Sequence, residues 1–168
     1  MLNRIVAALV LVLAFAATVL ADATADGRAV SDAFAKACSA GDVAGVMALY
    51  EDNATAIWPG EDEVATGKPA IEKLVKGACK PGSGSSVNTL VSQDSKAIGK
   101  DYIFIVGNWD ATSLGPDGYP VKVQIRTTEL LHKSGGKWRY EVDHASATGV
   151  MEYSLKAVPH PTRHPSIK

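Results

Sequence analysis

The sequence predicts an α+β domain in which helices at the N-terminus pack on one face of a curved antiparallel sheet. Two observations favour this fold class. Apolar residues recur at helical spacing through the first half of the chain, and four long strand-like segments follow one another in the second half. Helices first and consecutive strands afterwards is the order of an α+β domain. A curved sheet closed by helices forms a cone, and we expect this cone to contain a pocket.

Three segments of the first half have the apolar spacing of helices. Gly41 is expected to end the first of them, and Asp42 can cap the second. Pro69 fits the first turn of the third. A short strand, residues 54–58, is expected between the second and third helices. The expected helices are residues 26–40, 43–50 and 69–78.

The second half of the chain is expected to form four strands. Residues 98–101 and 133–136 have the composition of tight hairpin turns, and residues 115–118 supply a wider connection. Strands joined in this way are antiparallel neighbours. The expected strands are residues 87–97, 102–111, 121–132 and 138–147.

The amino terminus has the parts of an export signal. Arg4 precedes an apolar stretch, residues 5–20, and Ala21 and Ala23 are small residues after which cleavage can occur. The stretch is slightly short of the roughly 20 residues that cross a bilayer. We therefore expect a cleaved signal and a periplasmic or secreted protein, with a retained membrane anchor as the alternative.

The length that remains after the signal suits one domain with a single core. The end of the chain is rich in proline and histidine, so we expect a flexible tail there. The formal net charge of −1 lacks the basic excess that nucleic-acid binding calls for. The expected organisation is a signal peptide over residues 1–23, one domain over residues 24–155 and a tail over residues 156–168.

Cysteine and histidine side chains can serve as metal ligands, and cysteines can form cross-links. Cys38 and Cys79 can form a disulfide in an oxidising compartment, and two buried free thiols are the alternative. The four histidines have no paired ligand spacing within the expected domain, and the chain has no glycine-rich phosphate loop. We therefore expect a disulfide, no metal and no cofactor.

Alternation along the strands sorts the residues that could carry chemistry. On the last strand it places Tyr140 and His144 on the same face. With matching register, Arg126 on the neighbouring strand would meet His144 in one cavity. Either Asn108 or Trp109 would reach the same cavity from the strand beyond.

Two of these residues have a predicted role. His144 is the tentative catalytic residue, because an imidazole that titrates at about pH 6.5 can transfer protons. The alternative is a histidine whose ring is hydrogen-bonded within a packed sheet. Arg126 is suited to holding a carboxylate or another anion, with an internal ion pair as the alternative.

Five short segments carry a resemblance to a known family. They are LYEDNA at residues 49–54, GKPAI at residues 67–71, RTTE at residues 126–129, GKWR at residues 136–139 and DHAS at residues 143–146. In order and spacing they resemble the NTF2-like superfamily, particularly its SnoaL-like and DUF4440-like branches. They are also similar to the association domain of calmodulin-dependent kinase, another member of that superfamily.

The resemblance covers residues 27–148 and implies a cone-shaped domain that usually forms a homodimer through its outer sheet face. It implies that Tyr50 and Trp58 lie at the mouth of the pocket, whereas core packing is the simpler interpretation of both. The superfamily includes cofactor-free isomerases and dehydratases as well as non-catalytic modules, so the fold alone names no activity.

The functional prediction is an exported domain that binds a small organic molecule, anionic or carbonyl-bearing, in its cone. Arg126 would orient this molecule and His144 would face it, with aromatic walls around them. One alternative is a cofactor-free lyase or isomerase with His144 as general acid and base. Another is a non-catalytic assembly module whose function is its dimer surface.

Overall fold

The computed structural model describes residues 23–59, 64–79, 88–114, 120–148 and 152–153. The predicted export signal up to residue 22 and the predicted tail lie outside the described residues. The wider connection predicted at residues 115–118 lies outside them as well.

The helices lie where the apolar spacing predicts them, but the first includes residues 23–25 as well and the second is shorter than expected. Asp42 caps the second helix as expected, because its side chain accepts a hydrogen bond of 2.8 Å from the backbone nitrogen of Gly45. This helix is shorter than predicted, since Tyr50 already belongs to the next strand and its ring is buried there. The helices are the first helix (residues 23–40), α2 (Val43–Met47) and α3 (Lys68–Ala78).

The strands form one mixed sheet. They are β1 (Tyr50–Ile57), β2 (Ala65–Thr66), β3 (Thr89–Ile98), β4 (Tyr102–Leu114), β5 (Pro120–Ser134), β6 (Lys137–Ala147) and β7 (Glu152–Tyr153). Their order is β2-β1-β6-β5-β4-β3, with β7 pairing with β5. The four long strands β3 to β6 are antiparallel neighbours, as predicted.

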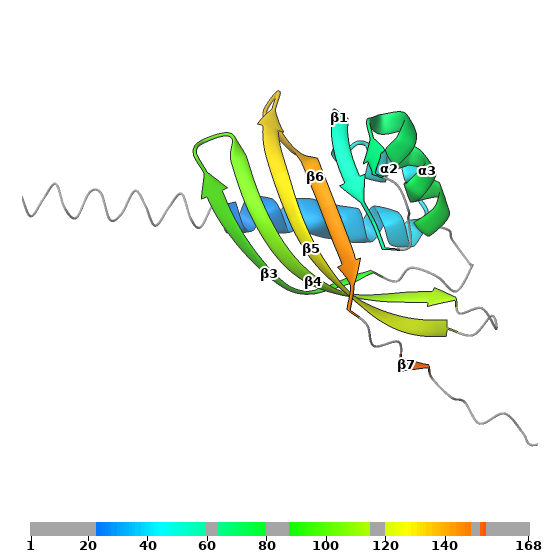
Figure 1. Cartoon of the computed structure of the whole chain (residues 1–168). Helices are drawn as coiled ribbons and strands as arrows, with labels where there is room; N and C mark the ends of the chain where they lie inside the picture. The colour runs from blue at the N-terminus through cyan, green and yellow to red at the C-terminus, as the bar shows by residue number, and fades with distance from the viewer. Residues whose placement is uncertain (1–22, 60–63, 80–87, 115–119, 149–151, 154–168) are drawn as a thin grey trace, which may run out of the picture.

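The prediction of a purely antiparallel sheet is wrong at one pair. Strand β1 pairs with β6 in parallel. Because these strands are far apart in the sequence, no hairpin turn between them could reveal their relative direction. Figure 1 shows the resulting curved sheet, with the first helix across one of its faces and α2 and α3 beside β1.

The predicted disulfide joins two of the helices. Cys38 lies in the first helix and is bonded to Cys79, which caps the end of α3. Each of the two residues is 2% exposed. The bond therefore ties the helix that covers the sheet to the helix beside β1, inside the hydrophobic core.

A bulge on β6 inverts the alternation that the sequence suggests. Leu130 pairs with Val142 and Leu131 pairs with Tyr140, so Glu141 is the extra residue. Beyond the bulge Asp143 lies on the same buried face as Tyr140, whereas its neighbour His144 is exposed. The prediction that Tyr140 and His144 share a face is therefore wrong.

The first helix approaches the sheet closely at Gly27. A Cβ atom at this position would lie 2.8 Å from Oγ of Ser95, 3.0 Å from Nε2 of Gln93 and 3.3 Å from Cδ1 of Ile105. These separations are shorter than van der Waals contact permits, so glycine sets the distance between the helix and β3 and β4. In contrast, a Cβ at Gly77 in α3 would meet no atom within 4 Å.

Alanine at these two glycines should therefore have opposite effects on stability. Gly77→Ala is expected to raise the free energy of unfolding by about 0.5–1 kcal/mol, because alanine restricts the unfolded chain and favours the helix. Gly27→Ala gains the same helical preference but is expected to lose about 1 kcal/mol net, because the helix must shift away from the sheet. Urea unfolding of both variants measures this, and equal stabilisation would contradict the close approach.

Candidate functional site

Two carboxyl groups lie side by side on the buried face of the sheet. Glu129 on β5 is directly opposite Asp143 on β6. Their exposed fractions are 3% and 5%. Directly opposed residues of antiparallel strands have Cβ atoms about 5 Å apart, so the two carboxyl groups interact electrostatically. We call this the acid pair.

Asp143 receives two side-chain hydrogen bonds on one oxygen. The hydroxyl of Tyr50 donates to Oδ2 in a short hydrogen bond, and Nε1 of Trp58 donates to the same atom at 2.8 Å. Both donors come from β1 and the residue that follows it, which the parallel pairing places beside β6. Donors of this kind favour the ionised carboxylate.

The electrostatics of the acid pair place the proton on Glu129. Burial raises the pKa of Asp143, and the hydrogen bonds from Tyr50 and Trp58 oppose that rise. Burial, with the negative charge of Asp143, raises the pKa of Glu129 to about 8, and only a hydrogen bond with Thr127 acts in the other direction. Two carboxylates this close do not both ionise readily. Near neutral pH the charge therefore resides on Asp143 and Glu129 is protonated.

Aromatic rings surround the acid pair. Phe34 of the first helix makes edge-to-face contacts with three rings at centroid distances of 6.0–6.2 Å, those of Trp58, Trp109 and Tyr140. Tyr140 also lies against Tyr50, at 5.1 Å between ring centroids. Such apolar surroundings strengthen any hydrogen bond that a ligand makes with the acids.

Unpaired polar atoms remain on this face. Oε2 of Glu129 and Oε1 of Gln93 are both buried, and neither has a hydrogen-bond partner within the described part of the chain. Leaving a buried polar atom unpaired costs about 1–3 kcal/mol. Such atoms in a native protein call for an explanation, and a functional role is one of them.

The site residues predicted from the sequence divide between the two faces of the sheet. Trp109 is buried, and its indole nitrogen donates to Oγ1 of Thr127 at 3.3 Å, beside Glu129. Tyr50 and Trp58 meet at Asp143, so the structure brings three of the predicted residues around the acid pair. The other three predicted residues are exposed on the opposite face: Asn108, Arg126 and His144.

The three exposed residues are still close to one another. Asn108 is directly opposite Arg126, and His144 is opposite Thr128, one position further along the same face of β5. The three residues therefore do lie on one face, but this face is not the one that carries the first helix. The predicted roles of Arg126 and His144 in binding and catalysis stay predictions.

Sequence reasoning did not select the acid pair. For Glu129 a signal was present, because it alternates in phase with Ile125 and Thr127, and a carboxyl group at an inward position of an apolar strand is unusual. For Asp143 the signal was misleading, since the bulge at Glu141 reverses the expected face.

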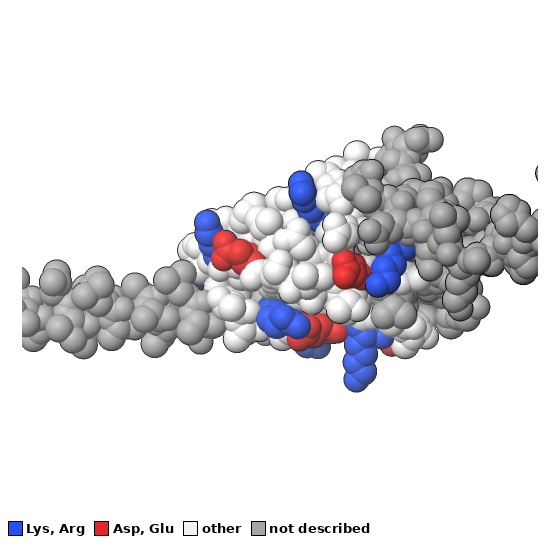
Figure 2. Space-filling model, turned by 90° about the horizontal axis from the view of Figure 1, so that it is seen from below, with Lys and Arg blue, Asp and Glu red and all other residues white. Residues whose placement is uncertain are grey.

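Charged side chains of both signs lie on the surface away from this site. Figure 2 shows Lys and Arg side chains beside Asp and Glu side chains on the face that it presents. One such exposed pair joins Arg28 and Asp32 at 2.8 Å. In the described ranges no cluster of three or more histidine, cysteine, aspartate or glutamate side chains could hold a metal ion. Within the same ranges, no helix has the length and apolarity needed to cross a membrane.

Solved structures with the same architecture come from several bacteria. A ketosteroid isomerase-like protein from Erwinia carotovora atroseptica is 19% identical, with a TM-score of 0.63, over 75% of this chain and 96% of that one. A candidate dehydratase of the NTF2-like family from Streptomyces avermitilis is 16% identical, with a TM-score of 0.64, over 78% and 99% of the two chains. A candidate scytalone dehydratase from Novosphingobium aromaticivorans is 13% identical, with a TM-score of 0.66, over 85% and 95%.

These identities are low enough that the likeness shows the fold and nothing finer. No curated protein matches the sequence. The model of the SnoaL-like domain, however, matches residues 28–150, which is most of the chain. The curved sheet, the covering helix and this match agree with the resemblance carried by the sequence motifs: the fold is that of the NTF2-like structures, and the chain belongs to the SnoaL-like family.

Proposed function

We propose that this protein binds a small, uncharged, carbonyl-bearing organic molecule between the first helix and the buried face of the sheet. Glu129 donates a hydrogen bond to the carbonyl oxygen, and the surrounding aromatic rings contact the rest of the molecule. The observation that carries the proposal is the buried Oε2 of Glu129, which has no partner among the described residues. A protonated carboxyl group in apolar surroundings is a strong donor to such an oxygen.

The charge of the site favours an uncharged ligand over an anion. Asp143 already holds a negative charge on this face, and Tyr50 and Trp58 both direct their donors to it. An anionic ligand would be repelled at short range in a medium of low dielectric constant. Of the two ligand classes expected from the sequence, the acid pair therefore supports the carbonyl-bearing one.

The same acid pair favours a second function, proton transfer without a cofactor. Asp143, as a carboxylate, is suited to taking a proton from the carbon beside the carbonyl group. Glu129 hydrogen-bonds the carbonyl oxygen at the same time and stabilises the negative charge that develops there. This assigns acid–base chemistry to the acid pair in place of His144.

Export and dimerisation belong to the proposal as well. A disulfide between Cys38 and Cys79 is compatible with an extracellular location, because such bonds persist in oxidising compartments. The half-exposed side chain of Val106 lies on the outer face of β4, and burial of such side chains between two copies would favour a homodimer.

Acetophenone, a neutral aromatic ketone, tests the proposal when compared with the benzoate anion. Acetophenone is expected to bind with a dissociation constant in the millimolar range or lower and to shift the indole N–H resonances of Trp58 and Trp109 in nuclear magnetic resonance spectra. Benzoate is expected to bind at least tenfold more weakly. Glu129→Leu is expected to lose at least tenfold in affinity for acetophenone, because the donor is removed. Glu129→Gln, which keeps an N–H donor, should retain most of it.

The matched control is Arg126→Ala, on the opposite face. Unchanged acetophenone affinity in this variant is expected, and a tenfold loss would locate binding on the outer face instead. Failure of acetophenone to bind the wild-type protein at any accessible concentration would rule out the proposed ligand class. The second function predicts that the protein catalyses exchange of the methyl hydrogens of acetophenone for deuterium in heavy water. Asp143→Asn is expected to lose this exchange.

A further inference from the structure

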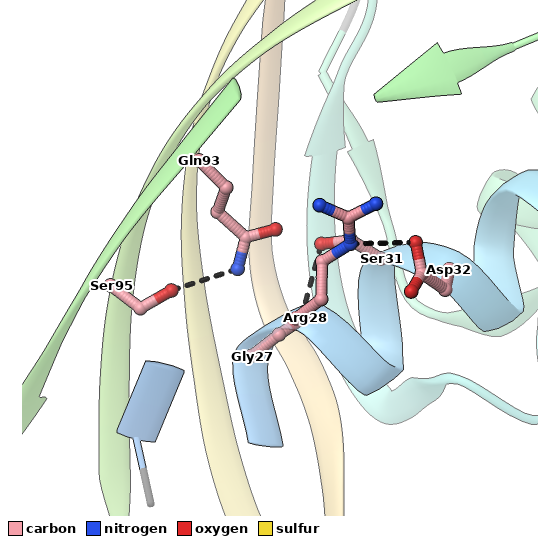
Figure 3. A network of polar contacts seen from close by, with 6 residues as sticks. All are labelled: Gly27, Arg28, Ser31, Asp32, Gln93 and Ser95. Carbon is pink, nitrogen blue, oxygen red and sulfur yellow. Dashed lines mark hydrogen bonds and ion pairs between the residues drawn. The ribbon is translucent and has the colours of Figure 1, made fainter. Parts of the chain in front are cut away.

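Gln93 has an unpaired amide oxygen in a fixed orientation. Its Nε2 donates to Oγ of Ser95 at 2.8 Å, while Oε1 is buried and has no partner among the described residues. Figure 3 shows both side chains projecting from β3 toward the start of the first helix, with the amide oxygen of Gln93 on the side away from Ser95. An amide oxygen can only accept hydrogen bonds, so its missing partner must be a donor.

The helix holds this amide in place. Gly27 of the first helix packs directly on Nε2 of Gln93 and on Oγ of Ser95, closely enough that a Cβ atom would be 3.0 Å and 2.8 Å from them. The carbonyl oxygen of Gly27 in turn accepts a hydrogen bond of 3.2 Å from the buried hydroxyl of Ser31. The unpaired oxygen thus lies beside the polar contacts at the start of the first helix (Figure 3).

The register relates Gln93 to the acid pair. Gln93 is opposite Gly107 on β4, and Gly107 is opposite Thr127 on β5. Glu129 follows Thr127 by two residues and therefore points to the same face. Two strand spacings of about 4.8 Å and an offset of two residues along the strand, about 6.6 Å, separate Gln93 from Glu129 along the backbone. A ligand that hydrogen-bonds to both side chains must span the part of this distance that the two side chains do not cover.

Gly107, which lies between Gln93 and Thr127 in the sheet, has no side chain. A Cβ atom there would lie 2.5 Å from Oγ1 of Thr127 and 3.0 Å from Nε1 of Trp109. The indole of Trp109 therefore lies over Gly107, with its N–H directed to Thr127. Trp109 and Ile105, which is directly opposite Glu129, are thus the apolar residues of β4 between the two unpaired oxygen atoms.

We infer that Gln93 is a second binding residue of the buried site and selects ligands that carry a hydroxyl or amino group at the end opposite to the carbonyl. This inference rests on the proposed binding of carbonyl compounds at Glu129 and adds the second polar group of the ligand. The ligand class becomes an uncharged hydroxy- or amino-carbonyl compound with an apolar body. Oε1 of Gln93 accepts from the hydroxyl or amino group, and Glu129 donates to the carbonyl.

Three matched ketones test this inference: 4-(hydroxymethyl)acetophenone, 4-(methoxymethyl)acetophenone and 4-methylacetophenone. The hydroxymethyl compound is expected to bind the wild-type protein about fivefold more tightly than the other two, because only it can donate to Gln93. Gln93→Leu is expected to remove this preference, so that the hydroxymethyl compound binds this variant no more tightly than the other two. Ser92→Ala, a change at the exposed neighbouring residue, is the control and should preserve the preference.

Gly27→Ala supplies a second variant that leaves Gln93 itself intact. The added methyl group forces the first helix and the amide of Gln93 apart, so the preference for the hydroxymethyl compound should fall in this variant too. Equal affinities for the three ketones in the wild-type protein, with all of them weakened by Glu129→Leu, would overturn the role of Gln93 and leave the proposed function standing. A preference that persists in Gln93→Leu would overturn it as well, whereas no binding of any ketone would refute the proposed function itself.

Discussion

Glu129→Gln is expected to keep most of its stability as the pH rises from about 4.5 to about 8, whereas the wild-type protein loses stability over this range. In the folded protein, burial and the charge of Asp143 raise the pKa of Glu129 to about 8. In the unfolded chain this group ionises near its ordinary value of 4.5. Between these two values the folded state binds more protons than the unfolded state, so stability falls as the pH rises.

The size of the effect follows from the shift in pKa. Each pKa unit corresponds to about 1.4 kcal/mol. The free energy of unfolding of Glu129→Gln should therefore exceed that of the wild-type protein by roughly 3–5 kcal/mol at pH 8. The two proteins should be similar at about pH 4, where the carboxyl group of Glu129 is protonated in both states. Urea unfolding at a series of pH values measures the difference directly.

A surface carboxylate provides the control for this measurement. Glu72 forms an exposed ion pair with Lys76 at 2.6 Å, so Glu72→Gln should change stability by less than about 0.5 kcal/mol at any pH. Parallel curves for the wild-type protein and Glu129→Gln would contradict a protonated Glu129 in the folded state.

Replacement of both cysteines by alanine is expected to lower the free energy of unfolding by about 4 kcal/mol. The bond between Cys38 and Cys79 closes a loop with a sequence separation of 41, and its removal restores that conformational freedom to the unfolded chain. The loss also frees the first helix from α3, so the helix that covers the acid pair is held by packing and by hydrogen bonds such as the one of 2.7 Å from Nε1 of Trp138 to Asp26.

A reducing agent gives an independent measurement of the same bond. The wild-type protein should unfold at lower urea concentration when dithiothreitol is present, and Cys38→Ala/Cys79→Ala should be insensitive to it. The double variant without dithiothreitol should match the reduced wild-type protein to within about 1 kcal/mol, since both lack the cross-link. A wild-type midpoint that does not move on complete reduction would contradict the expected contribution.

The sequence by itself determined the features that depend on local patterns. The spacing of apolar residues located the helices, and glycine-containing turns located the hairpins of β3 to β6. Gly99 and Gly135 do adopt the positive φ angles, 66° and 58°, that such turns require. Short motifs indicated the family, and two cysteines in an expected export product indicated the disulfide.

Only the tertiary structure decided which residues meet at the candidate site. The face of a strand residue alternates with a period of two, so the single extra residue Glu141 moved His144 outward and Asp143 inward. The parallel pairing of β1 with β6 then carried Tyr50 and Trp58 to Asp143 across a long sequence separation. Neither the bulge nor the long-range pairing has a local signature, because both result from the packing of the whole sheet against its helices.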